Sequence, residues 1–156
     1  MNNWMMCKVK YTKQLDNGAF KRVSEPYLFA AMSFTDAETR IYEELGAVIR
    51  GEFNVVSIAR YEVHDIFSYD DADVWYRGKV TYETFDDDKS KKISQTFLVS
   101  ANSVAEATSR IKEGLTGLLV DFEITGVVKT TIIDIFPYVE NLDRELSRES
   151  VNMEVE

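Results

Sequence analysis

Few side chains in this sequence could carry out bond-making chemistry. His64 is the only histidine and Cys7 the only cysteine, so a serine–histidine or cysteine–histidine pair would have to use them. The histidine- and cysteine-rich ligand sets that are typical of zinc sites cannot be built from one residue of each kind. We expect His64 at a strand edge or on a packed surface. We expect Cys7 to be a small buried side chain on the same strand face as Val9 and Tyr11.

Two short acidic clusters have the oxygen ligands that hard cations prefer. They are Asp70, Asp71 and Asp73 in one segment, and Asp86, Asp87 and Asp88 in another. Neither cluster has the glycine and the closing glutamate of a calcium-binding loop. The second is followed by three lysines, which is typical of a solvated hairpin turn. The glycines do not form a spaced phosphate-binding set at a strand-to-helix junction. We therefore predict neither a metal nor a cofactor.

The remaining candidates are basic residues that recur when the chain is compared with itself. Residues 4–67 and 75–136 can be aligned with small length changes in the loops, which is the signature of an internal repeat. The matching basic pairs are Lys8 with Lys79, Arg40 with Arg110, and Arg60 with Lys129. A structural interpretation is that each arginine pairs with a carboxylate such as Asp65 or Asp134. A functional interpretation is that the six basic residues converge on one groove that binds an anion.

Each repeat reads as strand, strand, helix, strand. Residues 4–13 alternate between apolar and polar side chains as a half-buried strand does, and the Asp-Asn-Gly sequence at residues 16–18 indicates a turn. A second strand is expected at about residues 22–32. Pro26 inside it favours an edge position or a bulge. The third strand, at residues 53–67 and again at 122–136, does not keep one alternation. Burial on both faces would explain this, and so would a bulge near residues 57–60; we favour a bent central strand.

The helix starts are the most specific local signals. Ser33 and Ser103 are each followed, three residues later, by a carboxylate, Asp36 and Glu106 respectively, which is the pattern of a capping box. Apolar residues then repeat at helical spacing in both copies. Gly114 predicts that the second helix is the shorter one. The apolar positions are Phe34, Ala37, Ile41, Leu45 and Val48 in the first copy, and Val104, Ala107, Ile111, Leu115 and Leu118 in the second.

These elements predict an α+β fold, formed by tandem duplication of a ββαβ unit. We expect approximate twofold symmetry between the units, with helices packed on antiparallel or mixed sheets. The units are predicted at residues 1–68 and 69–138. Because a unit of about 65 residues buries only a marginal core, we expect the two to share one core. Residues 139–156 form an acidic C-terminal tail.

The charge of the chain argues against polyanionic partners. The net charge is −9, with 8 basic and 9 acidic residues in 1–68, 8 and 12 in 69–138, and 2 and 6 in 139–156. Nucleic acids and anionic membranes are bound by clustered lysine and arginine, so both are disfavoured. One cysteine, with no secretory pattern at the start, favours a reducing compartment. We expect a cytoplasmic protein.

Several short sequences together resemble a known family. They are Cys-Lys-Val-Lys-Tyr at 7–11, Glu-Pro-Tyr-Leu at 25–28, Ser-Phe-Thr-Asp-Ala-Glu at 33–38, Trp-Tyr at 75–76 and Asp-Ile-Phe-Pro-Tyr at 134–138. The chain resembles a family labelled as a domain of unknown function (family 4494), apart from its tail. The resemblance implies an origin in Bacteroides-type bacteria or their phages and transfers no catalytic residue.

The absence of a nucleophile–base pair or metal set favours a non-enzymatic interaction module with a protein partner or self-association. Such a module should expose a broad patch with aromatic side chains. One alternative is a binder of a small, nucleotide-like anion in the groove between the units, held by Lys8, Lys79, Arg40, Arg110, Arg60 and Lys129. Another is an acidic decoy that presents carboxylates to a nucleic-acid-binding protein.

Overall fold

The computed structural model describes residues 3–138 of the chain. It divides into two compact units, one formed by residues 3–61 together with 134–138, and the other by Glu62–Ile133. Within the described residues the fold is α+β, with two helices and two mixed four-stranded sheets. The predicted α+β class is therefore confirmed. The predicted acidic tail at 139–156 lies outside the described residues.

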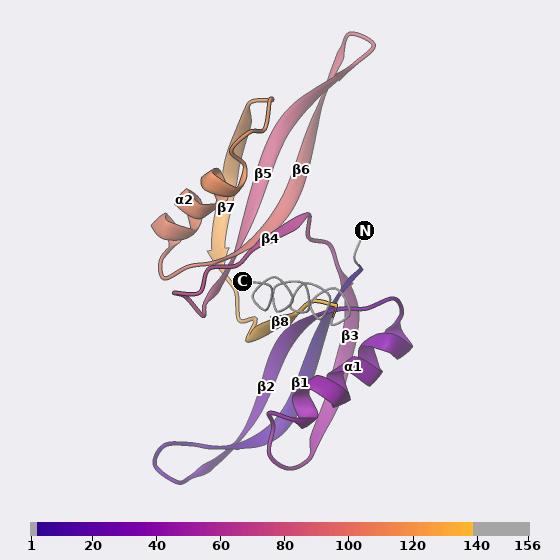
Figure 1. The fold of residues 1–156 in the computed structure, drawn as a ribbon, viewed down its shortest axis with the longest axis vertical. Helices are drawn as coiled ribbons and strands as arrows, with labels where there is room; N and C mark the ends of the chain where they lie inside the picture. Colours follow the sequence, from indigo (N-terminus) through magenta and orange to yellow (C-terminus); the bar gives the residue numbers. More distant parts are fainter. Residues whose placement is uncertain (1–2, 139–156) are drawn as a thin grey trace, which may run out of the picture. The chain divides into compact units, whose positions relative to one another are not determined.

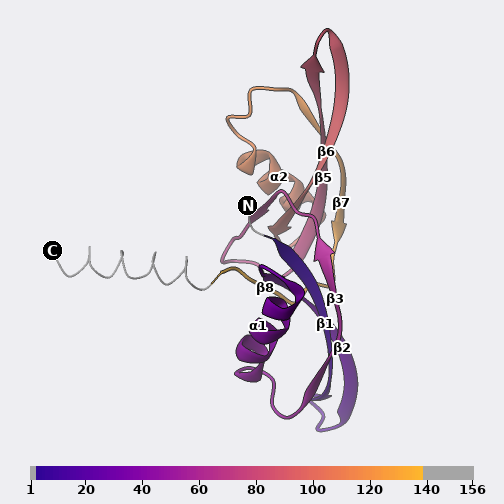
Figure 2. The ribbon, with the colours of Figure 1, turned by 90° about the vertical axis from the view of Figure 1, so that its right-hand side faces the viewer.

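Unit 1 is a four-stranded sheet with one helix across a face (Figure 1). The antiparallel part is made by β1, β2 and β3, and β8 adds to β2 as a parallel strand. Seen edge-on in Figure 2, α1 lies against one face of this sheet. The strand order is β3-β1-β2-β8. The bounds are β1 Trp4–Gln14, β2 Phe20–Ala30, α1 Phe34–Gly46, β3 Phe53–Tyr61 and β8 Asp134–Phe136.

Unit 2 has the same arrangement. Its order is β4-β6-β5-β7, in which β5 pairs antiparallel with β6 and β7, and β4 adds to β6 as a parallel strand. The helix α2 crosses one face of the sheet. The bounds are β4 Asp65–Phe67, β5 Trp75–Asp86, β6 Lys89–Ser100, α2 Val104–Gly114 and β7 Phe122–Lys129.

The short parallel strands are exchanged between the units. The strand β4 follows β3 of unit 1 along the chain but pairs with β6 of unit 2. Reciprocally, β8 follows β7 of unit 2 but pairs with β2 of unit 1. The predicted single, bent, central third strand is therefore wrong. Residues 53–67 and 122–136 each form two strands in two different sheets. The longer strand of each segment, β3 or β7, is an edge strand.

The chain leaves unit 1 at Tyr61 and returns to it at Asp134. The division into ββαβ units at residues 1–68 and 69–138 stays a prediction. Each unit has its own helix-facing apolar cluster. A single core shared by both units stays a prediction.

Local turn and bulge signals explain the strand boundaries. Gly18 in the first hairpin turn has φ +87°, and Asp87 and Asp88 in the second have φ 47° and 65°, the left-handed pair that a two-residue hairpin needs. The β1–β3 register slips by one residue at Val56 and the β5–β7 register at Thr125, so the predicted bulge lies immediately before residues 57–60. Pairing of β8 starts at Tyr27; Pro26 therefore lies where β2 is at the sheet edge, as predicted.

The two serine caps are confirmed. Ser33 Oγ accepts a hydrogen bond from the backbone N–H of Asp36, and Ser103 Oγ from that of Glu106, both at 3.0 Å. The carboxylates reach back one residue further than in the usual box, to the N–H groups of Met32 and Asn102. The helix α2, with 11 residues, is shorter than α1, with 13, because Gly114 ends it.

The middle of each predicted helical stripe is buried, and its ends are exposed. Ala37, Ile41 and Leu45 pack on the unit 1 sheet, and Ala107 and Ile111 pack on that of unit 2. The positions at the ends of the stripes are exposed: Phe34, Val48, Val104 and Leu118. Phe34 and Val104 are the first residues of their helices, and Val48 and Leu118 lie beyond the helix ends, where the helical spacing no longer applies.

Candidate functional site

Arg40 and Arg110 form the same structural feature in the two units, which we call the arginine clasp. Each guanidinium donates to the carbonyl of the last residue of the preceding strand, Ala30 in unit 1 and Ser100 in unit 2. Each also lies over a tyrosine ring two residues beyond the exchanged strand. The distance from Cζ to the ring centroid is 5.3 Å for Tyr138 and 4.1 Å for Tyr69. The clasps therefore hold the segments that follow β8 and β4 against the helices.

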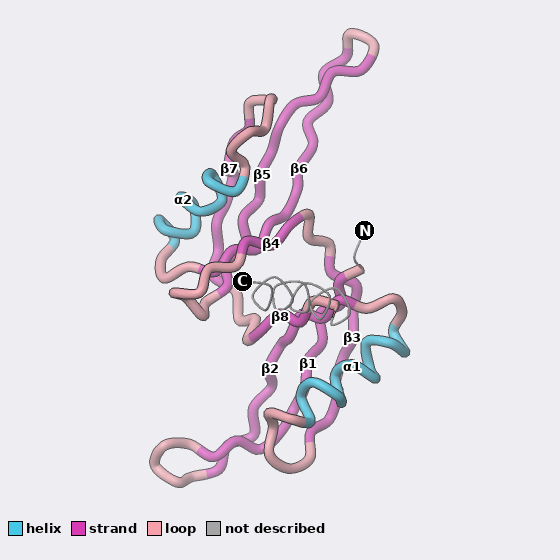
Figure 3. Tube along the Cα trace, in the orientation of Figure 1, coloured by secondary structure: helices cyan, strands magenta, loops and turns pink. Residues whose placement is uncertain are grey.

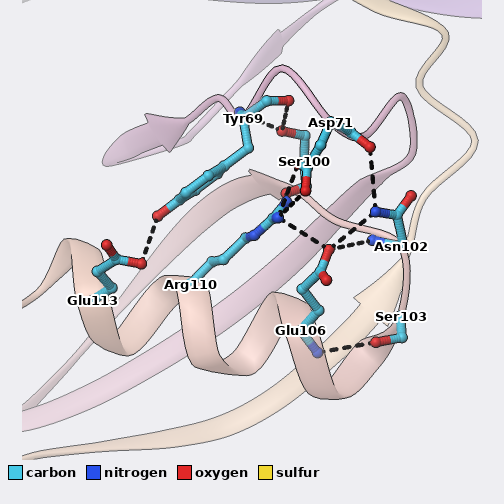
Figure 4. Close-up of polar contacts among 8 residues, drawn as sticks. All are labelled: Tyr69, Asp71, Ser100, Asn102, Ser103, Glu106, Arg110 and Glu113. Atoms are coloured by element: carbon cyan, nitrogen blue, oxygen red, sulfur yellow. Dashed lines mark hydrogen bonds and ion pairs between the residues drawn. The ribbon is translucent and has the colours of Figure 1, made fainter.

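The clasp of unit 2 is an ion-pair network (Figure 4). Arg110 Nη2 donates to both carboxylate oxygens of Asp71, at 2.8 and 2.7 Å, and lies 3.2 Å from Glu106 Oε1. The hydrogen bond from Arg110 lowers the pKa of Asp71, and the same bond raises the pKa of Arg110. Ser100 Oγ accepts from the backbone N–H of Tyr69 at 2.7 Å. Asp71 of the linker cluster is thus an ion-pair partner of the helix residue Arg110.

The clasp of unit 1 uses backbone carbonyls instead. Arg40 Nη2 donates to the carbonyl of Pro137 at 2.7 Å, and Nη1 lies 3.5 Å from that of Phe136. Arg40 is only 7% exposed, and among the described residues it has no carboxylate partner within salt-bridge distance. The hydroxyl of Tyr138 donates to Asp36 at 3.3 Å. Burial, followed by the nearby Asp36 charge, raises the pKa of Tyr138.

These contacts bear on the two interpretations of the repeated basic residues. Both arginines have structural partners, but Asp65 and Asp134, the carboxylates proposed from sequence, are not among them. Those two side chains accept from the backbone N–H groups of Ile66 and Ile135 instead. Among the side chains that the structure describes, no buried nitrogen or oxygen atom lacks a hydrogen-bond partner.

The other four candidate residues lie on the surface of their own units. Lys8 and Lys79 are exposed on β1 and β5, and Arg60 and Lys129 on β3 and β7. Arg60 has its guanidinium 5.8 Å from the centroid of the Phe34 ring. Convergence of all six residues on a groove between the units stays a prediction.

Neither His64 nor Cys7 has the surroundings of a catalytic group. His64 lies between β3 and β4, where its backbone N–H donates to Thr96 and its ring meets Phe97 edge-on at 5.3 Å. Cys7 is fully buried in the unit 1 core, and burial raises the pKa of its thiol to about 12. The thiol is therefore protonated at neutral pH and is a poor nucleophile. The prediction that Cys7 is a small buried side chain is confirmed.

One further polar cluster, in unit 1, holds an acid between two phenols. Glu25 Oε1 accepts from the hydroxyl of Tyr11 and lies 3.5 Å from that of Tyr27. Burial, together with the Glu25 charge, raises the pKa of Tyr11 and raises that of Tyr27 to about 12. Both phenols stay protonated as hydrogen-bond donors, so this arrangement does not provide a phenolate base.

A cleft lies in unit 2 beside the end of the β5–β6 hairpin; we call it the hairpin cleft. Its volume is about 540 Å³, and part of its wall is a loop that joins α2 to β7. The sequence did not predict this cleft. The sequence feature that marks it is the apolar run Leu118, Leu119 and Val120 after Gly117, of which Leu118 was expected in the helix. The lining residues are Thr81, Tyr82, Glu83, Phe85, Lys92, Leu119, Val120, Asp121, Phe122 and Glu123.

No cluster of three or more potential ligands among histidine, cysteine, aspartate and glutamate occurs among the described side chains of residues 3–138, which do not include that of Asp86. Over the same residues, neither helix is long and apolar enough to cross a membrane.

The family assignment rests on a sequence model described as "Domain of unknown function (DUF4494)", which matches residues 3–138. The chain belongs to this family. The predicted family is therefore confirmed, and the matched range coincides with the two units described above. Comparisons with curated proteins and with solved structures gave no match.

Proposed function

We propose that this family member is a non-enzymatic binding module that docks a protein partner at the hairpin cleft. The observation that carries the proposal is the exposure of large apolar side chains around this cleft. Leu119 is 99% exposed and Phe85 is 76% exposed, and Leu118 and Val120 lie beside Leu119 on the same loop. Clustered apolar side chains that face solvent are typical of interaction sites.

The corresponding loop of unit 1 supports this assignment by contrast. It joins α1 to β3 and places Ile49 in the core, where only 9% of the residue is exposed. It leaves Val48 70% exposed, whereas the loop between α2 and β7 exposes three consecutive apolar residues, Leu118, Leu119 and Val120. Both loops join a helix to an edge strand, but the loop of unit 2 exposes more apolar side chains. This difference favours a role in binding for the loop of unit 2.

A pull-down experiment tests the proposal. The tagged full-length chain would be incubated with an extract of the cells that encode it, beside a Phe85→Ser, Leu119→Ser double variant. The control is Phe20→Ser, Met32→Ser, which removes two exposed apolar side chains of unit 1. We expect a specific partner to be retained by the wild type and the control but lost by the cleft variant. Equal retention by all three, or no partner at all, would overturn the proposal.

The small-anion alternative has weaker support. Arg40 and Arg110 would have to leave their clasps to reach a ligand, at the cost of buried hydrogen bonds. No contact in either unit favours the acidic decoy over the binding module.

The proposal also covers the origin and setting of the chain. We infer that the two units descend from one ββαβ ancestor by tandem duplication with approximate twofold symmetry. The matched serine caps, bulges and arginine clasps support this inference. The single buried thiol is compatible with a reducing, cytoplasmic setting in a bacterium or its phage.

A further inference from the structure

We propose that the partner enters the hairpin cleft as an extended segment of alternating basic and apolar residues, which adds to β5 as a further strand. This inference rests on the proposed function, because it names the chemistry and the binding mode at the same cleft.

The first support is an open length of sheet edge. The strand β5 pairs with β6 from Trp75 to Asp86, but with β7 only from Tyr76 to Tyr82. Within the described part of the chain, no strand pairs with residues 83–86 on the β7 side. Figure 3 shows the β5–β6 hairpin continuing past the start of β7. The backbone groups on this side of β5 are therefore available to an incoming strand, as in other cases of strand addition.

The second support is that the cleft is directly beside this edge. Glu83 and Phe85 come from the open part of β5, and Phe122 and Glu123 from the first residues of β7. A strand that continued the line of β7 would therefore run along the cleft. At about 3.3 Å per residue, roughly four to six residues would cover the open edge and the loop beside it.

The third support is the charge of the lining, which selects the occupant. Three carboxylates, those of Glu83, Asp121 and Glu123, line the cleft together with one cation, Lys92. Lys92 lies directly opposite Glu83 in the β5–β6 register, so the other two carboxylates remain to attract basic side chains. The net charge of −9 adds a long-range attraction for a cationic segment.

Alternation of side chains follows from the geometry of an added strand. Successive side chains point to opposite faces, so one set can contact the carboxylates while the other contacts apolar groups. Glu83 and Phe85 share one face of β5, and Glu123 lies on the same face of β7, so the second set would contact Tyr82 and Phe122 on the opposite face. The chain's own segment 139–156 has the wrong charge for this site, with six acidic and two basic residues.

Fluorescence anisotropy with the purified full-length protein tests the inference. The probe is a fluorescein-labelled heptapeptide of alternating lysine and valine. One comparison peptide has glutamate in place of lysine, and another has N-methyl groups along one backbone edge. We expect saturable binding of the lysine peptide that weakens with salt, no binding of the glutamate peptide, and about tenfold weaker binding of the methylated peptide, which loses backbone hydrogen bonds.

Variants of the protein locate the site. Asp121→Lys, Glu123→Lys should weaken binding of the lysine peptide about tenfold or more. The control Glu38→Lys, Glu43→Lys makes the same change of net charge on exposed positions of α1 and should leave the affinity within about twofold. Circular dichroism of both variants shows whether each is folded; if the cleft pair is not, Asp121→Asn replaces it.

The outcomes separate this inference from the proposed function. Undiminished binding of the methylated peptide, or equal effects of the two charge variants, would overturn strand addition at the cleft. Absence of peptide binding, with the native partner still lost from the Phe85→Ser, Leu119→Ser variant, would overturn the basic-segment inference alone. Peptide binding with no cleft-dependent partner in the pull-down would overturn the proposed function alone.

Discussion

The two arginine clasps show how one residue at one position can be used in two ways. In unit 1, Arg40 is nearly buried and donates to backbone carbonyls. In unit 2, Arg110 holds the corresponding segment, which follows β4, through an ion pair with both carboxylate oxygens of Asp71. The side chain of Asp71 is 61% exposed. Each clasp fastens the segment that follows the short parallel strand of its own sheet. The comparison teaches that the fastening is common to both units, whereas the electrostatic means of achieving it is not.

Removing the buried arginine should have the largest effect. Arg40→Ala leaves the carbonyls of Ala30 and Pro137 without their donor, and we expect a loss of about 2–4 kcal/mol in the free energy of unfolding. Arg110→Ala should cause a clearly smaller loss, because water can solvate Asp71. Urea denaturation measures both, with exposed Arg22→Ala as the control. Equal losses for the two arginines would contradict the distinction drawn here.

The second-largest effect is expected where Phe67 of β4 packs on Gly114 of α2. A Cβ atom on Gly114 would lie 2.5 Å from Cζ of the Phe67 ring. We therefore expect Gly114→Ala to destabilise the protein by about 1–3 kcal/mol, although alanine favours helix. The matched change in α1 is Glu44→Ala, which should stay within about 0.5 kcal/mol. Thermal unfolding compares them, and a stabilised Gly114→Ala variant would show that Phe67 is free to move.

The smallest expected effect is a pH dependence confined to unit 2. The pKa of Asp71 is lower in the folded protein than its ordinary value of 3.8. Its contribution to stability is therefore fully present above about pH 4 and is lost as pH falls through the folded pKa. We expect Asp71→Asn to be less stable than the wild type at pH 7, with the difference shrinking below pH 4. Unfolding curves at both pH values, with Asp73→Asn as the control, measure this. A difference that grows on acidification would contradict the ion pair.

The sequence predicted what short-range signals encode. Ser33 with Asp36 and Ser103 with Glu106 specify a helix start within four residues, and Gly18 specifies its turn through one backbone angle. The position of Pro26 also indicated the free edge of β2. Each of these depends on neighbours along the chain.

What could not be predicted depends on partners far away in sequence. Asp-Ile-Phe at 65–67 follows β3 closely, so continuing one strand was the simpler interpretation, yet it pairs with residues 97–99. Its counterpart at 134–136 pairs with residues 27–29, more than a hundred positions earlier. The hairpin cleft was missed for a similar reason. Leu118 continues the helical spacing, although α2 ends at Gly114 and Gly117 has φ +98°.

The reciprocal exchange of β4 and β8 sets an order of events during synthesis. The sheet of unit 1 lacks its last strand until Asp134–Phe136 has emerged from the ribosome. Until then, residues 27–29 of β2 have no strand partner on that side. Unit 2 receives β4 before its own strands are made. Translation therefore completes the second half of this protein before the first, which reverses the N-terminal-first sequence usual for domains strung along a chain.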